Sequence, residues 1–302
     1  MINSLFGLFA AASLIKSPQP QQVVTVIRPL PKAADVQPVS PAPVKKDPAN
    51  LGVDTTSRAV FVADAKTGVV LYAKRAHDVM PIASLTKLMT AMVYLDTKPD
   101  LDATVMIQEG DIDEEGSPIF SAGDVMTQRQ ALEAMLVGSV NTAANALARV
   151  SLGKEAFVAA MNEKAKALNL TSPTFVEPTG LDPLNKASAA DVAAMLSTAM
   201  GYADVKALIT KSQSAFKTQG GHSYAIPTTD LLLTSYLNKD PYRILGAKTG
   251  SLPAAGYCMA LLTRDADDHE VVVASLGSVN HFARFQDVKA ATAWAFDAYE
   301  WK

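Results

Sequence analysis

Residues 58–74 contain two short hydrophobic runs, rich in valine, alanine and aromatic residues, separated by Ala65-Lys66-Thr67-Gly68. Runs of this length and composition are typical of β-strands. The four residues between them have the composition of a tight turn, in which glycine supplies the unusual backbone angles. The pattern therefore predicts a β-hairpin at the start of the folded part of the chain.

Leucine and methionine recur at every third or fourth position between residues 83 and 96, and this spacing predicts a helix. Thr127 and Gln130 have the spacing of a capping box, which predicts that a second helix begins there and continues through Val137. Further helices are predicted over residues 141–150, 154–168 and 188–200. The middle of the chain is thus predicted to be mostly helical.

After residue 230 the pattern returns to strands, which we expect over residues 242–248, 256–263 and 270–276, followed by an amphipathic helix over 281–301. Two early strands, a long helical insert and three late strands predict an α+β fold. Its antiparallel five-stranded sheet, built from both chain ends, would carry flanking helices. A mostly helical lobe, at about residues 85–235, would lie beside the sheet and form a cleft with it.

The N-terminal region differs in composition from the rest. Residues 2–15 are apolar but short for a membrane span, and no positive segment precedes them, so residues 1–16 are expected to be a degenerate signal peptide or an N-terminal anchor. A disordered apolar tail is the alternative. Residues 17–57 hold eight of the 17 prolines and are expected to form an extended linker. This division leaves 58–302 as the catalytic domain.

The overall charge and the metal-binding residue types limit the function classes. Lys and Arg total 27 against 30 Asp and Glu, a net charge of −3, so no nucleic-acid partner is expected and a neutral or small anionic ligand is favoured. The single Cys258 excludes an intramolecular disulfide, and it is interpreted as a core residue. The four histidines have no metal-ligand spacing. Chemistry without a metal or another cofactor is expected.

Three short motifs occur in a fixed order: Ser84-Leu85-Thr86-Lys87, Ser139-Val140-Asn141 and Lys248-Thr249-Gly250. Each has a second occurrence that is an ordinary helix-surface pair, cap or turn: Ser13, Ser151 and Ser214 for the first motif, Ser278 for the second and Lys66 for the third. Of the two Lys-Thr-Gly sequences, only the one at Lys248 comes after a Ser-x-Asn sequence in the chain. The Ser-x-Asn sequence that precedes it is the one at Ser139. Ser13 lies in the apolar N-terminal segment, so Ser84 remains as the first motif. Ser84 is predicted to start a helix at the junction of the sheet and the lobe, Ser139 to lie on a loop of the lobe and Lys248 to end a strand of the sheet. The three motifs are therefore predicted to converge on the cleft.

The first motif has the residues of an activated nucleophile. A serine hydroxyl needs a base, and Lys87, three residues after Ser84, shares its helix face. Lys87 must be neutral to accept a proton, and both burial and the charge of Lys248 are expected to lower its pKa. A helix N-terminus at Ser84 and the backbone N–H of Ser251 are expected to stabilise an oxyanion.

The other two motifs supply a proton relay and substrate contacts. Ser139 is expected to relay a proton between Lys87 or Lys248 and the leaving amine, and Asn141 to hold a substrate amide. Lys248 and Thr249 are expected to bind a substrate carboxylate, while Gly250 lets an extended peptide lie along the strand edge. Two further acids are candidate site residues that could equally cap a turn: Glu177 and Asp230.

With these motifs and their flanks, residues 58–301 resemble the D-alanyl-D-alanine carboxypeptidase and DD-endopeptidase family of low-molecular-mass penicillin-binding proteins. The resemblance includes residues 81–90, 135–145, 175–181 and 248–258. It implies a β-lactamase/transpeptidase-like fold and a serine peptidase acting on peptidoglycan stem peptides outside the cytoplasm, in the periplasm or tethered at its N-terminus. It also implies that Ser84 forms an acyl-enzyme and that β-lactams inhibit the protein.

Two departures and two alternatives accompany this resemblance. The chain ends soon after its closing helix, which is similar to the outline of DD-endopeptidases, and Asp230 stands where an asparagine is usual. Carboxypeptidase and endopeptidase activity are not distinguished. A class A β-lactamase would use Glu177 for deacylation, although the sequence around Glu177 resembles the peptidase family. A non-catalytic peptidoglycan-binding protein is the other alternative, and the intact Ser84 and Lys87 argue against it.

Overall fold

The computed structural model describes residues 42–113 and 118–301. The predictions for residues 1–16 and for most of the Pro-rich segment lie outside these residues. No helix within the described ranges is long and apolar enough to cross a membrane.

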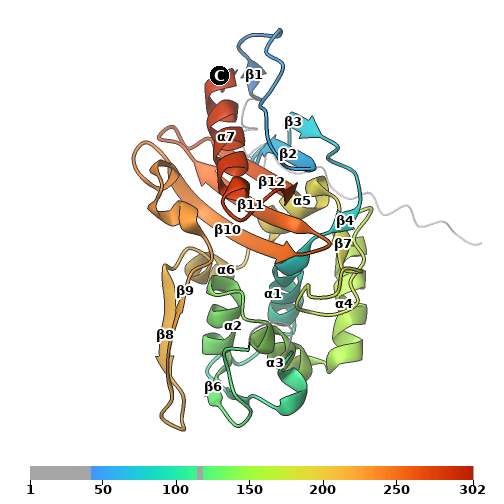
Figure 1. Ribbon diagram of the computed structural model, residues 1–302, viewed down its shortest axis with the longest axis vertical. Helices are drawn as coiled ribbons and strands as arrows, with labels where there is room; N and C mark the ends of the chain where they lie inside the picture. Colours follow the sequence, from blue (N-terminus) through green and yellow to red (C-terminus); the bar gives the residue numbers. More distant parts are fainter. Residues whose placement is uncertain (1–41, 114–117, 302) are drawn as a thin grey trace, which may run out of the picture. The chain divides into compact units, whose positions relative to one another are not determined.

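The central element is an antiparallel five-stranded sheet with the strand order β10-β11-β12-β2-β3 (Figure 1). The N-terminal hairpin supplies two strands, and three long strands come from the end of the chain: β2 Ala59–Asp64, β3 Val70–Lys74, β10 Arg243–Leu252, β11 Gly256–Arg264 and β12 Glu270–Ser278. The predicted sheet of both chain ends is confirmed, and β10 is an edge strand.

Both faces of this sheet are buried, and alternate residues of one strand enter different cores. In β12, Val272 and Ala274 belong to the core shared with the helical lobe, whereas Val271 and Val273 belong to the core under the last helix. Helix α5 (Ala189–Ala199) packs on the first face and α7 (Ala283–Ala298) on the second (Figure 1). A strand covered on both faces carries a continuous apolar run, as β12 does from Val271 to Ala274.

Helix α1 (Thr86–Asp96) is the centre of the helical lobe, with nine buried residues. It contacts four helices: α2 Gln128–Val137, α3 Asn141–Ser151, α4 Lys154–Ala167 and α5. The predicted capping box is confirmed, since the Thr127 side chain accepts from the Gln130 backbone and the Gln130 side chain from that of Thr127. The short α6 (Ala203–Leu208) contacts α2.

Three short two-stranded ribbons complete the lobe and its junction with the sheet. They are β4 Met80–Pro81 with β7 Lys186–Ala187, β5 Thr104–Met106 with β6 Val125–Thr127, and β8 Gln213–Lys217 with β9 Ser223–Pro227. The β4–β7 ribbon leads directly into the first motif. All of these strands except β4 lie within the region predicted to be mostly helical.

The two ends of the described chain differ from the sequence prediction. The last helix ends at Ala298 rather than continuing to residue 301, because β13 (Tyr299–Glu300) pairs with β1 (Val44–Lys45). The Tyr299 hydroxyl also donates to the Leu71 carbonyl. The end of the expected linker is thus part of the fold, and the predicted domain boundary at residue 58 is too late.

Candidate active site

Ser84 lies at the junction of the sheet and the helical lobe. It is the middle residue of a 3₁₀ turn, Ala83–Leu85, between β4 and α1, and its side chain is partly exposed. The preceding Ala83 has a φ of 49°, which turns the chain sharply into the helix. This turn packs against β10 and β11, so the predicted helix start at the junction is confirmed.

Lys87 is fully buried, and its Nζ atom contacts three oxygen atoms. It donates to Ser84 Oγ at 3.0 Å, to Asn141 Oδ1 at 2.6 Å and to the Thr179 carbonyl at 2.6 Å. Burial lowers the pKa of Lys87 to about 7, although the carboxylates of Glu177 and Asp113 act in the opposite direction. The lowered pKa expected from burial is confirmed.

The second and third motifs meet through Lys248. Its Nζ donates to Ser139 Oγ at 2.7 Å and to the Thr249 carbonyl at 3.1 Å. Ser139 lies between α2 and α3 with a φ of 60°, in a tight turn that points its hydroxyl to β10. Burial and then the charges of Lys87 and Arg284 lower the pKa of Lys248 well below its ordinary value. All three motifs therefore converge, as predicted.

β10 contributes the remaining residues of the third motif. Lys248 lies in the middle of this strand, not at its end as predicted, because pairing with β11 continues to Leu252. The Thr249 hydroxyl donates to the Thr229 hydroxyl at 2.6 Å. Ser251 is exposed. A Cβ atom on Gly250 would lie 3.0 Å from both the Ile82 carbonyl and the Ser84 nitrogen. Glycine at 250 thus allows β10 to lie close against the segment that carries Ser84.

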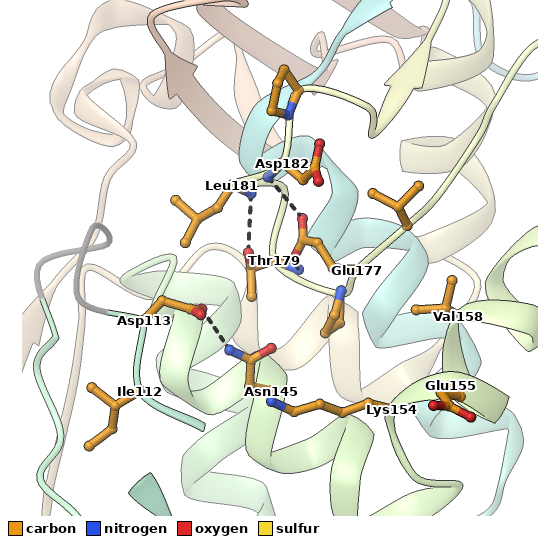
Figure 2. Close-up of a pocket in the computed structure, with 13 residues that line it drawn as sticks. Ile112, Asp113, Asn145, Lys154, Glu155, Val158, Glu177, Thr179, Leu181 and Asp182 are labelled. Atoms are coloured by element: carbon orange, nitrogen blue, oxygen red, sulfur yellow. Dashed lines mark hydrogen bonds between the residues drawn. The ribbon is translucent and has the colours of Figure 1, made fainter. Parts of the chain in front are cut away.

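Glu177 organises a loop and does not contact Ser84. Its carboxylate accepts from the backbone N–H groups of Thr179 at 2.5 Å and Gly180 at 2.6 Å, and from Asn185 Nδ2 at 2.6 Å. Figure 2 shows this carboxylate inside the turn that carries Thr179 and Leu181. Glu177 therefore holds the turn whose Thr179 carbonyl accepts a hydrogen bond from Lys87 Nζ.

The same loop contacts the segment that carries Ser84 at Gly180. This residue has a φ of 87°, and a Cβ there would lie 2.0 Å from the Ala83 carbonyl oxygen and 2.9 Å from the Ser84 nitrogen. Both the backbone angle and the close approach require glycine. On its other side the loop lines a pocket of about 1000 Å³, which also includes Asp113 and Asn145 (Figure 2).

Asp230 caps a 3₁₀ turn, Leu231–Thr234, with Oδ1 accepting from the Leu232 N–H at 2.8 Å. The alternative of a capping residue is therefore confirmed. Burial raises the pKa of Asp230 to about 6, although the Leu232 N–H and the charge of Arg284 lower it. The preceding Thr229 contacts Thr249, so Asp230 directly follows a residue that is hydrogen-bonded to the third motif.

Sequence reasoning missed Arg284 and the two threonines at 179 and 229. Arg284 lies in α7, is 4 % exposed and donates from Nη1 to the Gly250 carbonyl at 3.1 Å. Its signal was a charged residue on the apolar face of the final helix, next to Phe285. Thr179 acts through its carbonyl, which every residue type has, so the sequence carries no signal for it.

Potential metal ligands lie elsewhere. Within the described ranges, three metal-ligating side chains come within 4.8 Å of one another only at Asp265, Asp267 and His269. They follow the end of β11, whereas Gly250 pairs with Cys258 near the beginning of that strand. The site at Ser84 is built from hydroxyl, amine, amide and backbone groups.

Comparison with known proteins gives consistent similarities. The family model described as D-alanyl-D-alanine carboxypeptidase matches residues 44–279. A D-alanyl-D-alanine endopeptidase of Pseudomonas aeruginosa is 35% identical over 253 residues, covering 81% of this chain and 80% of that protein. One from Escherichia coli is 32% identical, covering 76% and 75%. The Streptomyces K15 DD-transpeptidase structure matches with a TM-score of 0.75 and 27% identity, covering 82% and 99%. The expected transpeptidase-like fold is confirmed.

Proposed function

Because the chain belongs to the D-alanyl-D-alanine carboxypeptidase family and is a serine DD-peptidase, we propose that it cleaves D-Ala-linked peptide bonds of peptidoglycan through an acyl-enzyme on Ser84. The observation that carries this proposal is the 3.0 Å contact between Ser84 Oγ and the buried amine of Lys87. An amine whose pKa is about 7 is neutral in a large fraction of molecules at neutral pH, so it can act as a base.

In the proposed reaction, Lys87 removes the proton as Ser84 Oγ attacks the carbonyl carbon of D-Ala. The backbone N–H groups of Ser84 and Ser251 stabilise the oxyanion of the tetrahedral intermediate. This pairing is supported by the close packing of Gly250, the neighbour of Ser251, on the Ser84 nitrogen. The carbon–nitrogen bond then breaks, and water hydrolyses the ester that remains on Ser84.

The leaving amine needs a proton, which we assign to the Ser139 hydroxyl. Ser139 accepts a hydrogen bond from Lys248 Nζ at 2.7 Å, so a proton donor is next to it when its own proton is transferred. Thr249 and Lys248 bind the substrate carboxylate beyond the scissile bond. Asn141 is expected to contact the substrate amide through Nδ2, since its Oδ1 is occupied by Lys87.

A β-lactam carries a strained amide and a carboxylate in the same relative positions as the substrate. We therefore propose that β-lactams acylate Ser84 and inhibit the protein. The two endopeptidase relatives make cleavage of cross-links the first activity to assay, followed by removal of a terminal D-Ala. Since the substrate lies outside the cytoplasm, we propose that the chain is exported. Residues 1–16 would serve as a signal peptide or anchor and 17–43 as a tether.

The test is incubation of the protein with benzylpenicillin, with intact mass followed over time and the adduct located by peptide mapping. We expect a long-lived adduct on Ser84 and hydrolysis of a D-Ala-D-Ala peptide or a cross-linked muropeptide. Ser84→Ala should lose both while keeping the circular dichroism spectrum. Rapid turnover of the drug would indicate a β-lactamase instead, and an unmodified protein with intact drug would indicate a groove that only binds.

A further inference from the structure

Two buried polar atoms beside the third motif have no hydrogen-bond partner within residues 42–113 and 118–301. They are Oδ2 of Asp230 and Nε of Arg284, and both residues are 4 % exposed. Unsatisfied buried polar groups are rare and costly, so each one needs a physical explanation. One is an acceptor and the other a donor, and the two residues attract each other electrostatically.

The chain segment around Asp230 connects the second and third motifs. The Thr229 N–H donates to the Val137 carbonyl at 3.2 Å, at the end of the helix that precedes Ser139. The Thr229 hydroxyl accepts from Thr249 at 2.6 Å. The Asp230 N–H donates to the Thr228 hydroxyl at 3.1 Å. The backbone at Asp230 is therefore fixed next to the groups that are assigned to the substrate carboxylate.

Arg284 provides a second connection to the third motif. Its Nη1 holds the Gly250 carbonyl at 3.1 Å, and its Nη2 lies 3.2 Å from His281 Nδ1. Nε is the atom left over for a negative partner. If Asp230 becomes a carboxylate, Arg284 is drawn towards it and its positive charge is neutralised locally. The positive potential at Gly250 and Thr249 then decreases.

A neutral carboxyl group behaves differently from a carboxylate at this position. When protonated, it has an O–H donor and an acceptor and closely resembles an asparagine side chain. Oδ1 then still caps Leu232, and the buried second oxygen carries no charge. The fold thus accommodates the neutral acid, whereas the ionised acid places a negative charge beside a site for another negative charge.

We propose that Asp230 is a specificity-determining positioning residue of the carboxylate subsite: in its neutral form it permits tight binding of carboxylate-bearing substrates, and its ionisation weakens that binding through Thr249 and Arg284. This inference rests on the proposed function. It gives the protein a preference for mildly acidic conditions in substrate affinity, separate from the chemical step that Lys87 controls.

The direction of the pH effect follows from the groups around Asp230. The elements around its turn carry several charged or titratable groups: Arg243 and Lys248 on β10, His281 just before α7, and Arg284, Asp287, Lys289 and Asp297 on α7. Lys289 lies over the Tyr236 ring. Asp287 of the same helix is bonded to Thr56 and Ser57. Burial raises the pKa of Asp230, and this outweighs the lowering by the Leu232 N–H and by the charge of Arg284. Affinity should therefore fall as pH rises through about 6.

The experiment compares the intact protein with Asp230→Asn, in which the neutral, asparagine-like state is permanent. KM and kcat are measured from pH 5 to 8 with a pentapeptide that ends in D-Ala-D-Ala. For the unmodified protein we expect KM to rise by on the order of tenfold over this range, because two like charges repel each other in a partly buried site. For Asp230→Asn we expect a KM that stays low, with the same pH dependence of kcat as the unmodified protein.

Taking the ratio of the two KM values cancels any effect of Lys87 or His281, which both proteins share. Asp191→Asn is the matched control, because Asp191 is also a buried capping acid, at the start of α5. Its KM profile should equal that of the unmodified protein. If Asp230→Asn does not fold, Asp230→Ser keeps a capping oxygen without the charge.

Equal KM profiles for the unmodified protein and Asp230→Asn overturn the inference, as does an affinity that increases with pH only in the unmodified protein. These results leave the proposed function intact provided that benzylpenicillin still labels Ser84. Absence of labelling at every pH is the different result that overturns the proposed function itself.

Discussion

The charge state of Lys87 should control the rate at which Ser84 is acylated. With a pKa of about 7, the amine is mostly an ammonium at pH 6 and mostly neutral at pH 8. Only the neutral amine can take the proton of Ser84 Oγ, which lies 3.0 Å away. The first-order acylation rate at saturating benzylpenicillin should therefore rise with pH and then reach a plateau.

The size of this change follows from the pKa. Roughly one-tenth of the molecules carry a neutral Lys87 at pH 6 and roughly nine-tenths at pH 8, so the rate should rise about tenfold between these values. Above about pH 8.5 it should be nearly constant. A lysine at the ordinary value of 10.5 would instead give about tenfold per pH unit up to pH 10. The plateau therefore distinguishes a lowered pKa from an ordinary one.

The perturbation that tests the cause is Asp113→Asn. The Asp113 carboxylate raises the pKa of Lys87, against the effect of burial. Removing its charge should move the midpoint of the profile to lower pH and leave the plateau rate within about twofold, because the base itself is unchanged. Asp113 also accepts from Asn145 Nδ2 at 2.6 Å, and asparagine retains an oxygen for this bond.

The assay is rapid mixing with benzylpenicillin, acid quenching and intact mass, from pH 5.5 to 9.5. The carboxylate of the drug stays ionised over this range, so its own charge does not contribute. Circular dichroism at each pH excludes unfolding. A rate independent of pH, a rise that continues tenfold per unit above pH 9, or a midpoint that moves upward in Asp113→Asn would each refute the assignment of Lys87 as the base.

Three other predictions follow from the site. Glu177→Gln should slow acylation by about tenfold and leave deacylation unchanged, since the loop that positions Thr179 loses an acceptor; a trapped acyl-enzyme, seen by mass, would instead indicate a deacylating role. Gly180→Ala should cost more than about 2 kcal/mol in urea unfolding and abolish acylation, whereas Gly153→Ala, at a φ of 79° with open space around it, should cost only about 1 kcal/mol. Asp230 has a folded pKa of about 6, above its ordinary value of 3.8, so the stability it contributes below pH 4 is lost as pH rises through 6. The free energy of unfolding of Asp230→Asn, measured with urea, should thus be higher than that of the unmodified protein by up to about 3 kcal/mol at pH 8. At pH 4 the two should be nearly equal.

The parts of the fold that depend on neighbouring residues were predictable from the sequence. The capping box of Thr127 and Gln130 is local, and the helix it starts ends at Val137 as expected. The hairpin around Lys66 is confirmed for the same reason. The prediction is wrong where pairing with another strand sets the end of an element. β10 extends to Leu252 because it pairs with β11, and α7 ends at Ala298 because the next residues pair with Val44–Lys45.

The candidate site likewise contains residues that the sequence predicts and residues that only tertiary packing brings in. Residues recognised by motif order, such as Ser84 and Ser139, meet as predicted because the fold brings their elements together. The Thr179 carbonyl and the Arg284 guanidinium reach the site only through tertiary packing of a loop and of α7. The predicted influence of Lys248 also changes: Lys87 is affected mainly by burial and two carboxylates, whereas the charge of Lys87 lowers the pKa of Lys248.

This asymmetry between the two lysines suits the chemistry. Both amines are buried in one groove, so having both charged is unfavourable, and their titrations are coupled. Lys248 lies beside Thr249 and Ser139, where a bound substrate carboxylate would stabilise an ammonium. Lys87 instead contacts the Ser84 hydroxyl. A carboxylate that enters the groove therefore favours the state in which Lys248 is charged and Lys87 is neutral. Substrate binding itself then prepares the base.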